Sequence, residues 1–73
     1  MRTLDSREIL SQNLVRYRSE HDLSQEDMAW ESHMSVRGYA QIERGEVQTS
    51  LRMLDKLSRS TGLSVTELLT PHK

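Results

Sequence analysis

Apolar residues recur at helical spacing along this chain, and short polar segments separate the runs. The first run predicts a helix over residues 6–21, because four apolar side chains share one of its faces: Ile9, Leu10, Leu14 and Tyr17. Asp5 and Glu8 stand at its start with the spacing of a capping box. A later run, of Leu51, Leu54 and Leu57, predicts a helix over residues 50–61 that Gly62 ends.

Between these runs lie two shorter predicted helices, over residues 25–32 and 36–44. Ser24 is placed as the N-cap of the first, with Asp27 as its capping-box partner, and Ser35 caps the second. Hydrophobic staples flank both caps, formed by the pairs Leu23–Met28 and Met34–Tyr39. Because only two residues separate the end of one helix from the cap of the next, the helices must cross steeply. That is the helix-turn-helix arrangement, in which the second helix lies in the major groove of DNA.

The chain closes with a short predicted helix over residues 65–70. Ser64 and Glu67 form its capping box, and Pro71 ends it. Gly45 supplies the left-handed residue expected at the end of the third helix. The sequence therefore predicts an all-α domain of five helices.

Composition narrows the class of protein. With 73 residues the chain is one small domain, which buries little over half of its unfolded surface. One Trp, two Tyr and no Phe imply an aliphatic core. The chain has no Cys, so we expect neither disulfides nor thiolate metal sites. Because it also has no apolar run of membrane-spanning length and no signal peptide, we expect a cytoplasmic protein that does not associate with a membrane.

The net charge of −1 is low for a protein that binds DNA. The acidic residues concentrate, however, at predicted helix N-termini, where they oppose the helix dipole: Asp5, Glu8, Glu26, Asp27 and Glu67. Affinity for DNA depends on the lysines and arginines that face phosphates rather than on the total charge. We therefore expect weak binding by a monomer and tighter binding by a dimer that engages two half-sites.

The residue pattern does not favour an enzyme. His21, His33 and His72 lie on separate predicted elements without metal-ligand spacing, and the chain has no glycine-rich phosphate loop. The carboxylates are accounted for as helix caps and charge pairs. We therefore expect no catalytic residue, cofactor, metal ion or small-molecule ligand.

One stretch of the chain carries a family pattern. It consists of Leu23-Ser24-Gln25, Glu26-Asp27, Met28-Ala29 and, further on, Ile42-Glu43-Arg44-Gly45. With this spacing the chain resembles the phage-repressor/Cro-like (Xre-like) helix-turn-helix family over residues 18–69. The resemblance implies a lambda-repressor-like domain over residues 1–73, with the helix-turn-helix at about residues 24–45. It also implies a transcription regulator, expected to be a repressor, that binds double-stranded DNA sequence-specifically as a homodimer on an inverted-repeat operator.

Three residues are expected to contact base edges: Val36, Arg37 and Gln41. Arg37 lies near the start of the third helix, the end that enters the groove, where a guanidinium can donate two bonds to guanine O6 and N7. Gln41 lies one turn further on the same face, and Val36 offers a methyl contact to thymine. In the family these places read bases, although here they match by position rather than by residue type. The alternative for Arg37 is an arginine that only faces solvent.

Seven residues are expected to contact phosphates: Ser24, Gln25, Ser35, Arg44, Gln48, Thr49 and Arg52. Gln25 leads this set, because it opens a predicted helix whose free N–H groups favour an anion. In the resembling family this glutamine holds a phosphate and braces the recognition helix. The alternative is that Gln25 only favours the helix.

The resemblance further implies an ion pair between Arg18 and Glu43, across the first and third helices. A half-buried pair at this place would fix the angle of the recognition helix. Removing one partner of a buried pair costs roughly 3–5 kcal/mol.

Four residues depart from the family pattern. His33 replaces the glycine of the turn, in a left-handed conformation that costs on the order of 1 kcal/mol. Ser32 replaces an apolar core residue, which is expected to weaken the packing of the second helix. Gly38 costs roughly 1 kcal/mol against Ala inside the recognition helix, and it leaves room for close approach of the backbone. Trp30 stands at a place that is usually polar, where it covers the rim of the core or belongs to a partner surface.

The helix at residues 64–70 is the expected dimerisation element. A small core can bury only one face of it, so Val65 and Leu69 are expected to leave apolar surface exposed, with Gly62 near the same contact. Two-fold pairing there would set two recognition helices about 34 Å apart. Two alternatives remain: an antitoxin or regulatory subunit that uses this fold mainly to hold a protein partner, and a DNA-binding fragment of a longer regulator.

Overall fold

The computed structural model describes residues 4–72, which fold into five α-helices. In chain order they are α1 (Ser6–Glu20), α2 (Gln25–Glu31), α3 (Val36–Glu43), α4 (Leu51–Thr61) and α5 (Val65–Leu68). No strand occurs in residues 4–72, and the predicted all-α, five-helix fold is confirmed. Every predicted helix is present, and the largest difference is that α5 ends two residues earlier than predicted.

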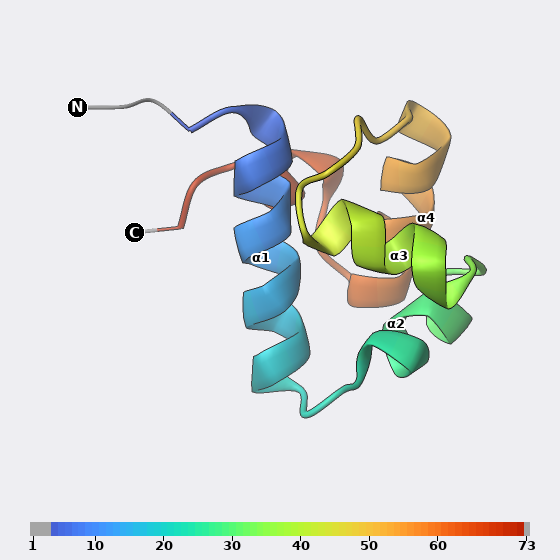
Figure 1. Ribbon diagram of the computed structural model, residues 1–73. Helices are drawn as coiled ribbons and strands as arrows, with labels where there is room; N and C mark the ends of the chain where they lie inside the picture. The colour runs from blue at the N-terminus through green and yellow to red at the C-terminus, as the bar shows by residue number, and fades with distance from the viewer. Residues whose placement is uncertain (1–3, 73) are drawn as a thin grey trace.

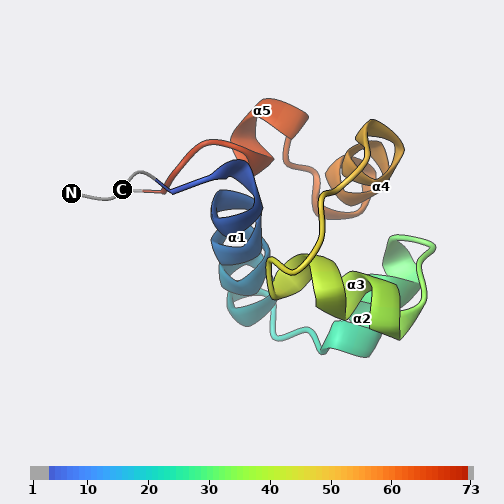
Figure 2. The same ribbon diagram turned by 45° about the horizontal axis from the view of Figure 1, so that its top comes forward.

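The longest helix, α1, forms one side of the molecule (Figure 1). The helices α2 and α3 pack on each other, α3 also packs on α1, and α5 packs on both α1 and α4. In Figure 2, α5 and α2 lie at opposite ends of the view, with α1 and α3 between them. The α2–α3 pair therefore packs on the longest helix, α1, through α3.

Each helix starts at a side chain that accepts a hydrogen bond from the backbone of its first turn. These N-cap residues are Asp5, Ser24, Ser35, Ser50 and Ser64. Ser24 and Ser64 complete the predicted capping boxes with Asp27 and Glu67. Because capping satisfies N–H groups that a helix leaves free, these residues explain where the short helices α2, α3 and α5 begin.

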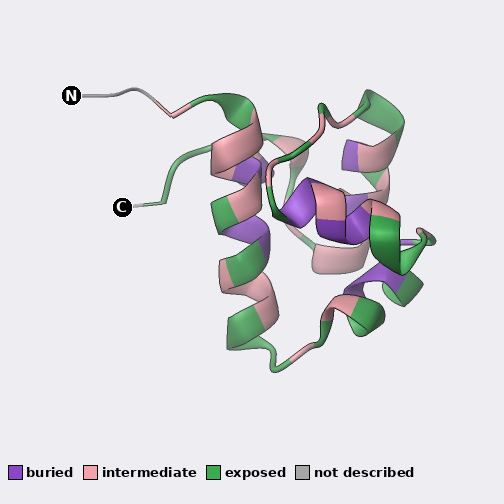
Figure 3. Cartoon of the chain, viewed as in Figure 1, coloured by how far each residue is buried: buried purple, intermediate pink, exposed green. Residues whose placement is uncertain are grey.

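All five helices contribute to one core. Its buried apolar residues are Leu10 and Leu14 from α1, Met28 and Ala29 from α2, Tyr39 and Ile42 from α3, Leu54 and Leu57 from α4, and Leu68 from α5. In Figure 3 the buried segments, drawn in purple, lie mainly where neighbouring helices approach one another. The predicted aliphatic core is present, with Tyr39 as its buried aromatic residue.

Three polar residues are buried as deeply as the leucines: Asn13, Ser32 and Glu43. The Asn13 amide on α1 donates to three backbone carbonyls at the end of α5: those of Glu67 at 3.3 Å, Leu68 at 2.7 Å and Thr70 at 3.0 Å. The Ser32 hydroxyl lies 2.8 Å from that of Ser60 on α4. Ser32, which was expected to weaken the packing of α2, has its hydroxyl satisfied by this bond, which links α2 to α4.

Candidate nucleic-acid interface

The connection between α2 and α3 is a tight turn with a left-handed residue. His33 has φ 55°, as predicted for its replacement of glycine. The amide of Met34 donates to the carbonyl of Ala29 at 2.9 Å, and the amide of His33 donates to that of Trp30 at 3.2 Å. These two bonds form a Schellman motif, which ends α2 and turns the chain directly into the cap of α3.

The helix α3 has a buried face and an exposed face. Tyr39, Ala40, Ile42 and Glu43 are buried. Val36 and Arg37 are exposed at its start, and Gln41 is half-buried. Two of the three predicted base-contact residues, Val36 and Arg37, are therefore accessible, and Arg37 forms no ion pair within residues 4–72.

Gly38 lies at a crowded point of this helix. Its amide donates to the Ser35 hydroxyl at 3.0 Å, and a Cβ added to Gly38 would also come within 3.0 Å of that oxygen. The glycine therefore avoids a close contact with the N-cap hydroxyl, and it leaves the start of α3 without a side chain at this position.

Glu43 joins α1, α2 and α3 through an ion pair and a hydrogen bond. The Arg18 guanidinium donates from Nε to Oε2 at 2.9 Å and from Nη2 to Oε1 at 2.9 Å. Arg18 also donates to the carbonyl of Leu23 at 3.1 Å. The structure thus contains the pair that the resemblance implied, with Glu43 4% exposed and the Arg18 side chain 25% exposed.

The Gln25 amide also donates to Oε1 of Glu43, at 3.2 Å, a contact that the sequence interpretation missed. A carboxamide has two N–H donors and one acceptor, so within residues 4–72 the bond to Glu43 leaves one donor and the oxygen of Gln25 for another partner. The residue that opens α2 is thereby braced against the end of α3.

The charges of this network perturb one another. Burial by itself raises the pKa of Glu43, but interactions with Arg18, Tyr39 and Gln25 outweigh it and hold that pKa below its ordinary value. Burial, followed by the neighbouring Glu43 carboxylate, raises the pKa of Tyr39 well above its ordinary value. The Tyr39 hydroxyl is buried and has no hydrogen-bond partner of good geometry within the described residues. The carboxylate is therefore ionised at neutral pH and the phenol is neutral.

Apart from Gln25, the predicted phosphate contacts fall into three groups: two N-cap serines, two arginines and two residues of the loop after α3. Ser24 and Ser35 are exposed but already serve as N-caps. Arg52 is exposed at the start of α4 without an ion pair in residues 4–72, whereas Arg44 is paired with Glu46.

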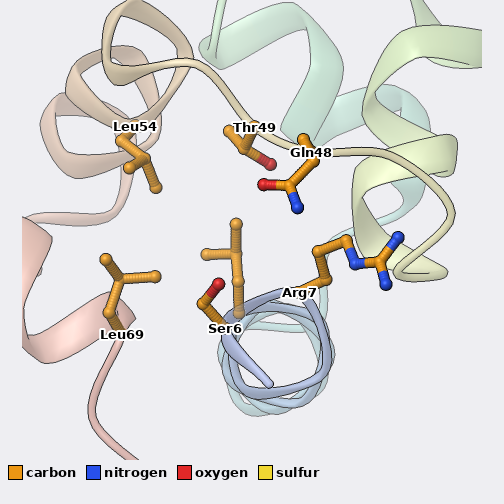
Figure 4. Close-up of a pocket in the computed structure, with 7 residues that line it drawn as sticks. Ser6, Arg7, Gln48, Thr49, Leu54 and Leu69 are labelled. Carbon is orange, nitrogen blue, oxygen red and sulfur yellow. The ribbon is translucent and has the colours of Figure 1, made fainter.

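Gln48 and Thr49 follow α3 in the loop toward α4. Together with Ser6 and Arg7 they line a hollow of about 60 Å³ (Figure 4). Gln48 is exposed and Thr49 is half-buried, so the loop passes between solvent and the start of α1.

The residues of the predicted dimer surface are all at least partly exposed. Gly62 is exposed, with φ 77° at the end of α4. Val65 and Leu69 are half-buried against the core, and Leu69 also borders the hollow of Figure 4. Only part of their apolar surface therefore faces solvent.

Trp30 is 84% exposed, so it does not cover the rim of the core. It lines a shallow hollow with His33 and Met34, beside the turn between α2 and α3. Of the two interpretations of Trp30, a partner surface fits this position better.

Neither a metal site nor a membrane span stands out in the described part of the chain. No group of three or more His, Cys, Asp or Glu residues in residues 4–72 is placed to hold a metal ion. None of the described helices has the length and apolar composition needed to cross a membrane.

Comparisons with known proteins agree with this geometry. A family model described as helix-turn-helix matches residues 14–68. An HTH-type transcriptional regulator of Sinorhizobium fredii (strain NBRC 101917 / NGR234), y4dJ, described as uncharacterized, is 32% identical over 68 residues, which cover 93% of this chain and 88% of the relative. Control protein C.SmaI of Serratia marcescens is 36% identical over 67 residues, which cover 92% of this chain and 80% of the relative. No solved structure matches the chain. The chain belongs to the phage-repressor/Cro-like (Xre-like) helix-turn-helix family of transcription regulators.

Proposed function

We propose that this protein binds double-stranded DNA sequence-specifically and represses transcription as a homodimer on an inverted-repeat operator. The observation that carries the proposal is the exposed start of α3, where Arg37 forms no ion pair with any residue from 4 to 72 and Gly38 carries no side chain. A major groove about 12 Å wide admits such a helix. A protein that binds chromosomal DNA in this way would be located in the cytoplasm.

In this proposal Arg37 reads a guanine, and Val36 and Gln41 contact neighbouring bases. Arg52 and Gln25 hold phosphates on either side of the groove. The bond from Gln25 to Glu43 supports this role, because it fixes the side chain before DNA arrives and so reduces the ordering cost of binding.

Selection of bound duplexes from a random pool tests the proposal directly. We expect the selected sequences to share an inverted repeat whose half-sites lie about one helical turn apart. A pool without any common motif would refute sequence-specific binding.

Variants of Arg37 then test which side chain reads the sequence. Arg37→Lys keeps the positive charge but loses the planar fork, so it should lose roughly 1–3 kcal/mol of discrimination per half-site while retaining its affinity for random DNA. Arg52→Ala should instead weaken binding to all sequences alike. If Arg37→Lys keeps the wild-type preference for the selected operator, Arg37 does not read a base.

The homodimer is tested by the stoichiometry of the complex. Sedimentation of the protein with the selected operator should give two chains per duplex. Sedimentation of the protein alone shows whether the dimer also forms without DNA. A 1:1 complex would show that the protein acts as a monomer.

A second candidate function is binding to a protein partner, as an antitoxin or regulatory subunit. The exposed Trp30 favours it, because large aromatic residues are common anchors of interfaces. Trp30→Ala should then leave affinity for the selected operator unchanged and abolish regulation of a reporter gene in cells. Unchanged regulation would argue against a partner at this surface.

A further inference from the structure

Arg44 is the phosphate candidate whose charge is already paired. Its Nε donates to Oε2 of Glu46 at 2.9 Å, and its Nη2 donates to Oε1 at 3.3 Å. Two parallel N–H···O bonds are also what a guanidinium offers to a phosphate. Glu46 therefore occupies the Nε/Nη2 edge of Arg44, one of the edges that can bind a phosphate in this way.

The backbone after α3 holds this carboxylate in place. Gly45 has φ 71°, and its amide donates to the carbonyl of Ile42 at 3.0 Å. The amide of Glu46 donates back to the carbonyl of Gln41 at 3.0 Å, which completes a Schellman motif. The chain reversal sets Glu46 beside Arg44, so the pairing follows from the turn and not from the side chains alone.

We propose that Glu46 competes with DNA phosphate for Arg44 and so lowers the affinity of this protein for DNA of any sequence. The proposal rests on the DNA-binding function proposed above. The side chains of Arg44 and Glu46 are 53% and 51% exposed, so the pair holds the fold only weakly and a phosphate can open it.

Even after the Arg44–Glu46 pair has opened, Glu46 weakens the binding of DNA. The displaced carboxylate stays tethered two residues from Arg44, where it repels the incoming phosphate. Phosphate contacts carry no base information, so Glu46 lowers specific and non-specific affinity by the same factor. The effect is to keep non-specific binding low while discrimination remains with α3.

Glu46→Gln tests the competition, because it removes the charge and keeps the shape. Binding to a random-sequence duplex is measured by fluorescence anisotropy over a series of salt concentrations. We expect roughly fivefold tighter binding at low salt, and a slope of log K against log[salt] that is steeper by about one unit for each bound chain.

Glu67→Gln is the matched control. It removes the same charge from an exposed residue of α5, and a glutamine can keep the capping box with Ser64. We expect Glu67→Gln to change the affinity for the random duplex less than twofold.

The role of Arg44 is isolated by repeating the substitution without it. In an Arg44→Gln background, Glu46→Gln should bring no further gain in affinity. The proposal is overturned if Glu46→Gln alone binds no tighter than wild type, or if its gain persists when Arg44 is absent. Failure of the wild-type protein to bind any duplex would instead refute the proposed function itself, before any variant is compared.

Discussion

Replacing Glu43 by alanine should lower the free energy of unfolding by about 3 kcal/mol. The carboxylate is 4% exposed and accepts hydrogen bonds from both Arg18 and Gln25. Without it, the Arg18 guanidinium keeps its bond to the Leu23 carbonyl but loses its counter-charge. Breaking a fully buried pair costs roughly 3–5 kcal/mol, and the 25% exposure of Arg18 places this case at the lower end.

A loss of that size is large for a chain of 73 residues, whose total stability is on the order of 4–11 kcal/mol. It corresponds to a fall in melting temperature of roughly 10–20 °C. Thermal unfolding at neutral pH, followed by circular dichroism, measures it. Glu46→Gln is the control, because it removes one partner of an exposed ion pair and should change stability by less than about 0.5 kcal/mol.

An unchanged melting temperature for Glu43→Ala would refute the reasoning that this pair holds α3 on α1. Replacing both charges by apolar residues, as in Arg18→Met with Glu43→Leu, should recover part of the loss, since no buried charge is then left unpaired. If the double variant is less stable than Glu43→Ala, the cost of the single change does not come from the orphaned guanidinium.

Three further predictions concern acid, the Asn13 contacts and the turn. The lowered pKa of Glu43 stabilises the fold fully above the ordinary glutamate value of about 4.3, and this contribution is lost as the pH falls through the lower folded value. Below a pH of about 4.3 the free energy of unfolding should thus fall more steeply with pH for wild type than for Glu43→Gln, and equal pH dependence would contradict this. Asn13→Ala should cost roughly 2 kcal/mol in urea unfolding, because the buried Leu68 carbonyl loses its donor, whereas a loss below about 0.5 kcal/mol would show that water replaces the amide. His33→Gly should raise the melting temperature by a few degrees, since it removes on the order of 1 kcal/mol of left-handed strain, and a decrease would mean that the His33 side chain stabilises the turn.

The parts of the fold that the sequence predicted well depend on residues close together in the chain. Caps such as Ser24 and Ser64 act on an amide three residues away, so the spacing alone indicates them. The left-handed conformation of His33 was implied by the family resemblance, in which a glycine stands at this place of the turn. Such local signals located all five helices to within two residues.

The contacts that the sequence did not predict join distant parts of the chain. Asn13 lies between Leu10 and Leu14 on the buried side of α1, and a polar residue in that setting signals a buried partner without naming it. The partner carbonyls lie 54 to 57 residues further on. Ser32 and Ser60 pose the same problem across 28 residues, because two serines carry no pattern that pairs them.

At the candidate interface some hydrogen-bond partners were implied by the sequence and others were missed. The resemblance implied that Arg18 and Glu43 meet, yet nothing in it placed the Gln25 amide on the same carboxylate. Arg44 was expected to hold a phosphate, although an acidic residue only two positions away was a visible sign of competition. Positions on a helix face follow from periodicity, whereas the partner of an exposed side chain depends on the geometry of the loop beside it.

The three bonds from Asn13 to the end of α5 also bear on the order in which this chain folds. With four residues, α5 is too short to be stable as an isolated helix, so it must form on a surface that is already present. Its anchor, Asn13, lies 55 residues away from Leu68 along the chain, and closing so long a segment carries an entropic cost that only an assembled core offsets. We therefore expect docking of α5 to be a late step of folding. In the native protein the amides of α5 should accordingly exchange with solvent whenever α5 detaches from the folded core, so that the shortest helix reports a local opening and not the unfolding of the whole domain.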